Sequence, residues 1–310
     1  MESNLSSTSD PNKVDPTSAD WDPTIPELPG KIISGIRVPH FYDLESVEKL
    51  KNMKMRPDDI WVVSYPKCGT HWTMQIVRLI LNRGKDDGKN IMETVLWIEA
   101  FNKDSPYNSQ INLDELPSPR AFKSHFSYEM MPCGLPSTTP GRYIYLSRNP
   151  KDVVVSYYHH DRGFQFNPIL EWSQYFEVFM QGKVHFGDYF DNILGWWAHK
   201  DDDNVLFLKY EDMKKDLPTT VARIAKFIGQ DISQELVDEI AHRATFANMK
   251  KDSYANCKWV DDERRPDEAD FIRKGAVGDW KNYFTPEQEA RLDAVYEKRM
   301  KGTGLDFDFH

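Results

Sequence analysis

The stretch at 60–81 constrains the fold of this chain most. An apolar, β-branched segment at 60–63 leads into a short loop with Lys67, Gly69 and Thr70, and apolar residues at helical spacing follow. This pattern predicts a strand, a tight loop and a helix. The unpaired backbone N–H groups and the positive dipole end at such a helix start favour an anion. An ordinary turn with an exposed lysine is the alternative if the stretch is taken alone.

The order of residues in this loop separates it from the common nucleotide loop. In Gly-x4-Gly-Lys-Ser/Thr the lysine follows the second glycine, whereas here Lys67 precedes Gly69. The loop is therefore P-loop-like, but it is a phosphate loop of another kind.

Composition limits the partners of the protein. The 310 residues suit one large α/β domain or two modest ones. The formal net charge of −10 provides no basic field for nucleic acid, so local charge must hold any anionic ligand. Three cysteines far apart in the sequence predict a reducing compartment, and no apolar run approaches the roughly 18 residues of a membrane span. We expect a cytoplasmic protein with no nucleic-acid or membrane partner.

Strand-like and helical segments alternate along the chain after a tail at 1–30, which is rich in Ser, Thr, Asp and Pro and which we expect to be flexible. We expect strands at 60–63, 120–126, 142–148 and 205–210, and helices at 43–51, 91–100, 170–179, 189–199 and 219–228. The alternation predicts a single α/β domain at 31–310, with a mostly parallel central sheet flanked by helices. In such sheets ligands bind at the carboxyl ends of the strands.

Polar residues stand at two of these strand ends. Lys123 and His125 end the strand at 120–126, and a neutral imidazole there can accept a proton at pH 7. Arg148 ends the next strand, with Ser156 two turns into the following helix. A guanidinium binds phosphate oxygens in pairs. A structural histidine and a surface arginine are the alternatives.

A basic loop near the carboxyl end of the chain is a further candidate anion site. Arg273 and Lys274 precede Gly275 and Gly278, so two cations lie in a flexible segment of an acidic chain. Taken alone, such a loop is usually a solvated turn.

Together these motifs resemble those of the cytosolic sulfotransferases, which use 3′-phosphoadenosine 5′-phosphosulfate (PAPS) and release 3′-phosphoadenosine 5′-phosphate (PAP). The matching segments are Tyr-Pro-Lys-Cys-Gly-Thr-x-Trp, Arg-x-x-Lys-x-His, Arg-Asn-Pro-Lys-Asp-Val and Arg-Lys-Gly-x-x-Gly-Asp-Trp, and the resemblance covers about 38–307. It implies PAPS binding by Lys67, Cys68, Gly69, Thr70, His71, Trp72, Arg148, Ser156, Tyr210, Thr245, Phe246, Arg273, Lys274 and Gly275.

The resemblance also implies a mechanism. His125 would deprotonate the acceptor, Lys67 would stabilise the leaving phosphate, and Lys123 would hold the sulfuryl oxygens, as expected for a loose transition state that depends on positioning and charge. No metal is required, and we expect none. Cys68, where the family often has Ser, is expected to be a filler rather than a nucleophile.

Aromatic segments beside the motifs predict the acceptor pocket, for a small, largely apolar or aromatic hydroxyl or amine compound. The expected residues are His40, Phe41, Tyr42, Trp97, His125, His159 and His160; relatives often have Phe at the last position. Many relatives dimerise through Lys-x3-Thr-Val-x3-Glu. Here Pro286 and Ala290 replace the Val and Glu, so both a monomer and a homodimer remain open.

Three other functions remain as alternatives. A phosphate-transferring kinase would need the other loop order. A non-catalytic binder of PAPS or of a hydrophobic ligand could dispense with Lys67, Lys123 and His125, all of which are present. A dehydratase acting through a transient sulfate ester is compatible with the same residues.

Overall fold

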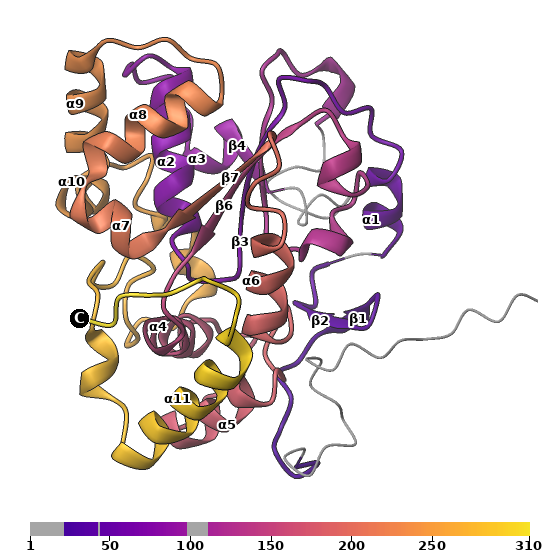
Figure 1. Ribbon diagram of the computed structural model, residues 1–310, viewed down its shortest axis with the longest axis vertical. Coiled ribbons are helices and arrows are strands. Elements are labelled where there is room, and N and C mark those ends of the chain that lie inside the picture. The colour runs from indigo at the N-terminus through magenta and orange to yellow at the C-terminus, as the bar shows by residue number, and fades with distance from the viewer. Residues whose placement is uncertain (1–21, 43, 98–110) are drawn as a thin grey trace, which may run out of the picture.

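A five-stranded, fully parallel sheet forms the centre of the computed structural model, which describes residues 22–42, 44–97 and 111–310 (Figure 1). The strand order is β4-β5-β3-β6-β7. Val62 of β3 is in register with Lys123 of β5 on one side and with Ile144 of β6 on the other. The strands are β3 (Ile60–Ser64), β4 (Val95–Trp97), β5 (Ala121–Ser124), β6 (Arg142–Ser147) and β7 (Val205–Lys209). The predicted fold class is confirmed.

Alternate residues of the strands build two separate cores. In β3, Ile60 and Val62 pack with one set of helices, whereas Trp61 and Val63 pack with the other. Because both faces of the sheet are covered, the strands are apolar throughout rather than alternating. One core includes α2 (Thr70–Leu81), α3 (Ile91–Thr94), α8 (Leu217–Phe227) and α9 (Gln234–Arg243), and the other includes α4 (Pro150–Gly163), α5 (Trp172–Met180), α6 (Tyr189–Trp197) and α11 (Pro286–Met300).

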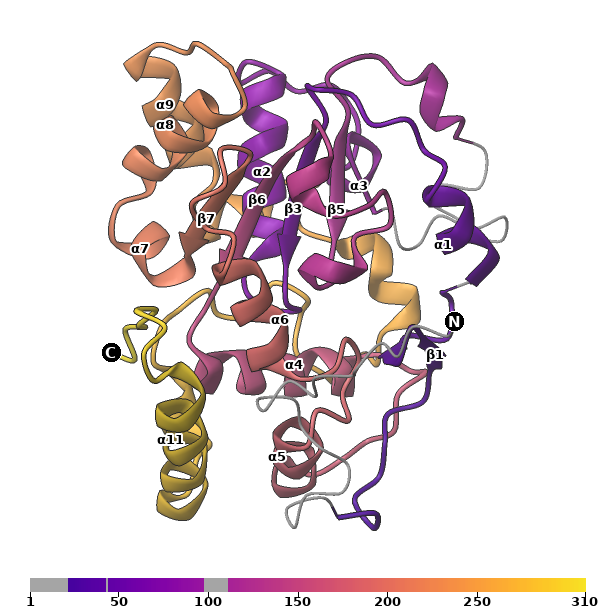
Figure 2. The ribbon, with the colours of Figure 1, turned by 45° about the vertical axis from the view of Figure 1, so that its right-hand side comes forward.

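Helix α4 lies across the carboxyl ends of the strands (Figure 2). Its start is specified locally: Asn149 caps it by accepting from the backbone N–H of Asp152 at 2.8 Å, and Pro150 occupies the first helical position. This arrangement brings Arg148 and Ser156 to the same end of the sheet as the phosphate loop.

Shorter elements complete the structure. β1 (Lys31–Ile33) and β2 (Ile36–Val38) form an antiparallel hairpin. The remaining helices are α1 (Leu44–Leu50), α7 (Tyr210–Lys215), α10 (Phe246–Lys251) and short 3-10 segments that include Lys258–Glu263 and Asp279–Asn282. In the part of the chain that the structure describes, no helix is both long and apolar enough to cross a membrane.

Two expectations differ from the structure. The helix expected at 91–100 is wrong from Val95 onward, because Val95–Trp97 form the edge strand β4 beside β5; pairing with a formed strand overrides the weak helical pattern, and 98–100 lie outside the described residues. The tail prediction also extends too far. Leu28 is buried and its N–H donates to the carbonyl of Lys183, so residues 22–30 contact the body of the protein.

Candidate active site

A cavity of about 910 Å³ opens at the carboxyl ends of the strands. Its walls come from the segments after β3, β5, β6 and β7 and from the segment at 257–276. Most of the candidate residues line this one cavity: Phe41, Lys67, Gly69, Thr70, His71, Trp72, Trp97, Lys123, His125, Arg148, Ser156, His159, His160, Tyr210, Phe246, Arg273, Lys274 and Gly275, with His40 beside them.

The phosphate loop requires a glycine at position 69. Gly69 caps α2 with a φ of 109°, and a Cβ there would lie 2.8 Å from side-chain atoms of Leu146 and of Tyr210. The hydroxyls of Ser64 and Thr70 are 2.5 Å apart, which ties the first turn of α2 to the end of β3. The loop therefore presents the N-terminus of a twelve-residue helix to the cavity.

Lys67 extends into a cationic and apolar environment. Its Nζ lies 4.5 Å from the ring centroid of Phe271. Burial, followed by the charges of Arg264 and Lys123, lowers the pKa of Lys67 to about 7. An anion beside Lys67 would therefore restore its charged form.

His125 is held as a neutral base. Its Nδ1 lies 2.8 Å from the carbonyl oxygen of Ser64. A carbonyl only accepts hydrogen bonds, so Nδ1 carries the proton and the lone pair is on Nε2. Burial, together with the charges of Lys123 and Lys67, keeps the pKa of His125 well below its usual range. Lys123 Nζ lies 3.6 Å from the ring centroid of Trp97.

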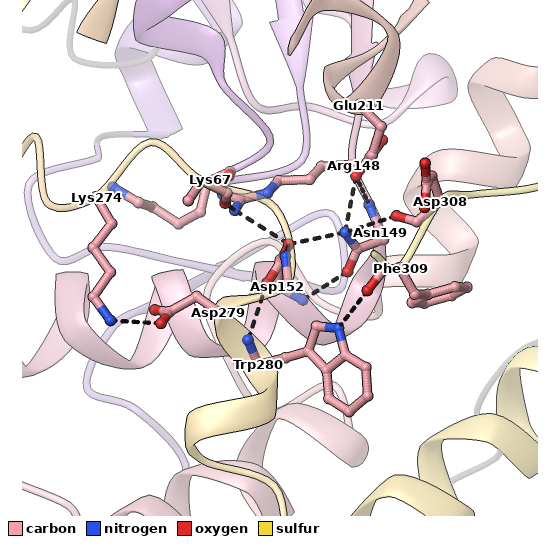
Figure 3. A network of polar contacts seen from close by, with 12 residues as sticks. Lys67, Arg148, Asn149, Asp152, Glu211, Lys274, Asp279, Trp280, Asp308 and Phe309 are labelled. Atoms are coloured by element: carbon pink, nitrogen blue, oxygen red, sulfur yellow. Dashed lines mark hydrogen bonds and ion pairs between the residues drawn. The ribbon is translucent and has the colours of Figure 1, made fainter. Parts of the chain in front are cut away.

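Arg148 joins three segments of the site (Figure 3). Its guanidinium donates to the carbonyl of Ala276 at 2.9 Å and to that of Lys67 at 3.4 Å. The same group lies 4.4 Å from the ring centroid of Tyr210. It is 7% exposed, so its charge faces the interior of the site rather than bulk solvent.

Arg273 and Lys274 both bind the carboxylate of Asp279, each at 2.6 Å. Burial opposes ionisation of this carboxyl, but hydrogen bonds from Lys274 and Arg273 lower the pKa of Asp279 to about 2. The Lys274 contact is visible in Figure 3. The two cations are therefore held at one end of the cavity.

Aromatic rings stand beside these cations. Trp72 donates its indole N–H to the carbonyl of Ala244 at 2.7 Å, and its ring lies 5.2 Å from that of Tyr210. Gly275 packs against Phe246 so closely that a Cβ would lie 2.4 Å from the ring. A flat group can therefore lie among Trp72, Tyr210 and Phe246.

The other end of the cavity is aromatic and includes His160, whose Nδ1 lies 3.1 Å from Asp161 Oδ1. His159, expected from the sequence in the acceptor pocket, lies instead near Arg273 and Asp279: burial and the charge of Arg273 lower its pKa to about 4, and its Nε2 lies 2.7 Å from the hydroxyl of Tyr283. Burial raises the pKa of Asp161 to about 7, against a hydrogen bond from Tyr175. Aromatic rings that line this end come from Phe41, Trp97, Phe164, Phe166, Phe186 and Phe271.

Comparison with known proteins identifies the family. A family model described as a sulfotransferase domain matches residues 57–304. The chain belongs to the sulfotransferase family. Its reaction is accordingly the transfer of a sulfuryl group, as the motifs predicted.

Individual relatives agree with this assignment. A rabbit amine sulfotransferase is 39% identical over 86% of this chain and 88% of the relative. A mouse sulfotransferase solved with PAP has a TM-score of 0.72 and 32% identity, covering 89% of this chain and 94% of that one. Retinol dehydratase solved with retinol and PAP has a TM-score of 0.78 and 27% identity, covering 88% of this chain and 90% of that one.

Cys68 of this sulfotransferase is fully buried, and burial raises the pKa of its thiol above the usual range, which fits the expected filler rather than a nucleophile. Three other candidate residues differ from the simplest expectation. The His71 ring contacts the carbonyl of Ala255 at 2.6 Å, so its imidazole is directed to the protein. Tyr42 and Thr245 do not line the cavity: Tyr42 is buried behind Trp97, and the Thr245 hydroxyl donates to the carbonyl of His242.

Sequence reasoning missed several residues of the sulfotransferase site. Asp152 and Asp279 lay inside recognised motifs, but their hydrogen-bond roles depend on contacts between distant segments. Asp161 and Arg264 lie in segments with no motif, so no pattern could identify them. Among the described residues, no cluster of three or more His, Cys, Asp or Glu side chains could hold a metal ion.

Proposed function

We propose that this sulfotransferase moves the sulfuryl group of PAPS to a hydroxyl or amine of a small acceptor, with His125 as general base. The observation that carries the proposal is that Lys67, Lys123 and His125 line the same cavity as the cations expected to bind the nucleotide. The acceptor oxygen forms a bond to sulfur as the bond from sulfur to the 5′-phosphate oxygen breaks. PAP leaves, and the acceptor proton passes to Nε2 of His125.

The supporting geometry for His125 is its fixed tautomer. The Ser64 carbonyl accepts the hydrogen bond of the Nδ1 proton, so the lone pair of the neutral ring is on Nε2, the nitrogen that takes the acceptor proton. A positioned base contributes on the order of 10²–10⁴-fold to the rate. Lys67 and Lys123 stabilise charge on the leaving phosphate and on the sulfuryl oxygens, each worth about 3–4 kcal/mol at a preorganised site.

Nucleotide binding divides between two groups of residues. The 5′-phosphosulfate binds at the loop of Lys67–Thr70, and the adenine lies among Trp72, Tyr210 and Phe246. Arg148, Ser156 and the loop of Arg273–Gly275 bind the 3′-phosphate, with the phosphate taking over contacts that Asp279 makes in the free protein. Support comes from the related structures, whose titles name PAP.

The acceptor is a small molecule that fits the aromatic end of the cavity. Related structures were solved with androsterone and with retinol, both largely apolar alcohols. We expect a cytoplasmic location, which the three cysteines far apart in the sequence support. Monomer and homodimer both remain predictions. In the degenerate dimer segment, Thr285 caps α11 and Pro286 is its first residue.

The test is a sulfation assay with ³⁵S-labelled PAPS against phenols, sterols, amines and aliphatic alcohols, run on wild type and on His125→Asn. We expect the variant to lose at least 10²-fold in kcat while it binds PAP with unchanged affinity by isothermal titration. His242→Asn, an exposed histidine outside the cavity, is the control. Substantial turnover by His125→Asn would remove His125 from its role.

Dehydration through a transient sulfate ester is the second candidate, favoured by the TM-scores of 0.77 and 0.78 to retinol dehydratase. Mass spectrometry of the product distinguishes the two reactions. A stable sulfate ester indicates simple transfer, whereas an alkene together with free sulfate indicates elimination. A purely non-catalytic binder is disfavoured because Lys67, Lys123 and His125 converge on one cavity.

A further inference from the structure

A buried arginine lines the cavity and has unused hydrogen-bonding capacity. Arg264 is only 6% exposed. Its Nη2 donates to the carbonyl of Ala269, whereas its Nη1, which is shielded from solvent in the free protein, has no hydrogen-bond partner among the described residues. Within the described part of the chain, no carboxylate lies within 4.0 Å of its guanidinium nitrogens. The guanidinium of Arg264 therefore forms no ion pair with the described residues.

The Arg264 side chain packs against the end of helix α4. Gly163 ends α4 beneath the guanidinium, and a Cβ there would lie 2.2 Å from Arg264 Nη2. The ring centroid of Phe164 lies 5.0 Å from the central guanidinium carbon of Arg264. Any side chain at 163 would displace the guanidinium, so Arg264 can occupy this position in the cavity wall only because residue 163 is a glycine.

The backbone around Arg264 is fixed by the neighbouring residue. Arg265 N–H donates to the carbonyl of Gly163 at 2.8 Å, and its guanidinium donates to the carbonyls of Phe164 at 2.6 Å and Asn167 at 2.7 Å. The N–H of Gln165 donates to the carbonyl of Glu263 at 3.0 Å. These hydrogen bonds connect residues 163–167 to residues 263–265, so the backbone position of Arg264 is fixed by contacts with another segment.

The charge of Arg264 is poorly compensated. Burial lowers its pKa, which expresses the cost of keeping the cation away from water. Asp261 has the largest opposing charge effect, but it is exposed, and no carboxylate oxygen of the described residues lies within 4.0 Å of the guanidinium. Asp270 pairs with Lys250 at 2.8 Å, and Glu268 pairs with Arg162 at 2.7 Å. A buried cation without a close counter-charge is unfavourable unless a ligand supplies one.

We propose that Arg264 binds an anionic group of the acceptor, so that this sulfotransferase acts on hydroxylated, largely apolar carboxylic acids. The proposal rests on the proposed function. The acceptor carboxylate accepts hydrogen bonds from the guanidinium, its apolar body lies among Phe164, Phe166 and Phe41, and its hydroxyl faces His125. Lys67 and Lys123 are engaged by the nucleotide in that complex. Lys31 also lines the cavity, but its ammonium donates to the carbonyl of Tyr42 at 2.6 Å, so Arg264 is the buried cation for the acceptor.

The test uses para-substituted phenols that differ mainly in charge: 3-(4-hydroxyphenyl)propanoate, neutral 4-ethylphenol and the amine tyramine. We expect wild type to have the highest kcat/KM for the acid. Arg264→Gln should lose about 10- to 100-fold in kcat/KM for the acid, through KM, because a charged hydrogen bond is lost. The neutral compound should change less than threefold.

Further variants separate a binding role from a structural one. Arg264→Lys should recover part of the preference for acids, and Gly163→Ala should reduce it by displacing the guanidinium. Lys258→Gln, which removes an exposed charge from the same segment, should leave the preference unchanged. Thermal melting and PAP affinity are measured for each variant, so that a misfolded protein is recognised.

The outcomes discriminate between the proposals. Equal kcat/KM for acid and neutral compounds in wild type would overturn the role of Arg264, as would a preference for tyramine. An equal loss for all acceptors in Arg264→Gln would also overturn it, since Arg264 would then act on the nucleotide or on Lys67. A wild-type protein that binds PAP but transfers label to no acceptor would instead count against the proposed function.

Discussion

Asp152 Oδ2 accepts a hydrogen bond from the backbone N–H of Gly278 at 2.8 Å, across 126 residues of sequence. Its other oxygen accepts from the N–H of Trp280 at 3.1 Å, and Asn149 Nδ2 donates to Oδ2 at 3.0 Å. Arg148 lies 3.6 Å from the same carboxylate. One buried carboxylate on α4 therefore sets the position of the loop of Arg273–Gly275 relative to Arg148 (Figure 3).

Replacing Asp152 by Asn should weaken nucleotide binding. The amide group would direct an NH₂ toward one of the backbone N–H groups, leaving a buried donor unsatisfied at a cost of about 1–3 kcal/mol. We expect lower stability by that amount in urea unfolding and about tenfold weaker PAP binding by titration calorimetry. Asp203→Asn, at an exposed site, is the control. Unchanged PAP affinity in Asp152→Asn would show that the loop position does not depend on this carboxylate.

The segment at 307–310 should support the same loop. The carbonyl of Phe309 accepts from the Trp280 indole at 3.1 Å, and the carbonyl of Asp308 accepts from Asn149 at 3.3 Å. A chain shortened to end at Asp306 loses both bonds, each worth about 0.5–1.5 kcal/mol. We therefore expect about tenfold weaker PAP binding.

A substitution separates these backbone contacts from a surface ion pair. Asp308 also pairs with Lys215 at 2.8 Å, but the lysine is 63% exposed, and such pairs contribute little. Lys215→Gln in the full chain should bind PAP as wild type does. If the shortened chain did so too, the segment at 307–310 would have no role in the site.

The parts of the fold that could be predicted are those specified by short-range pattern. The apolar run before Lys67 could only be a buried strand followed by a helix, and the carboxyl ends of parallel strands necessarily share one edge. That rule alone places Lys67, His125 and Arg148 together. Edge strand β4 was missed because its three residues, Val95–Trp97, are too few to outweigh the helical pattern before them.

The parts that could not be predicted depend on pairing between distant segments. The hydrogen bond from Gly278 to Asp152 and the packing of Arg264 on Gly163 correspond to no periodic pattern in the sequence, so neither contact could be predicted. Charge was also misleading by itself, since Arg273 and Lys274 looked like free cations and instead bind Asp279 in the free protein.

PAP binding should weaken as pH rises above about 7. Burial and neighbouring cations lower the pKa of Lys67 to about 7 in the free protein, so the ammonium is lost as pH rises through that value. A bound phosphate favours the ammonium and raises its pKa. Binding between pH 7.5 and 9 must therefore take up a proton, and affinity should fall by up to about tenfold per pH unit.

Calorimetry in buffers of different ionisation enthalpy measures this proton uptake. Lys67→Met should bind PAP more weakly at pH 7 and take up no proton above it. The same uptake in Lys67→Met as in wild type would assign the proton to another group and contradict the role of Lys67.

Arg120 directly precedes β5 and His125 directly follows that strand, but Arg120 should matter for stability rather than for the reaction. Its guanidinium contacts both oxygens of Asp59, at 2.7 and 2.5 Å, and donates to the carbonyls of Leu113 and Lys54. Asp59 is fully buried, and neither residue lines the cavity. Arg120→Met leaves this carboxylate without its counter-charge, which typically costs about 3–5 kcal/mol.

The double variant Arg120→Met/Asp59→Leu should recover much of that loss in urea unfolding, because no unpaired charge remains. At a temperature where Arg120→Met is folded, its PAP affinity and kcat should be close to those of wild type; a large loss of kcat without a loss of stability would instead place Arg120 in the reaction.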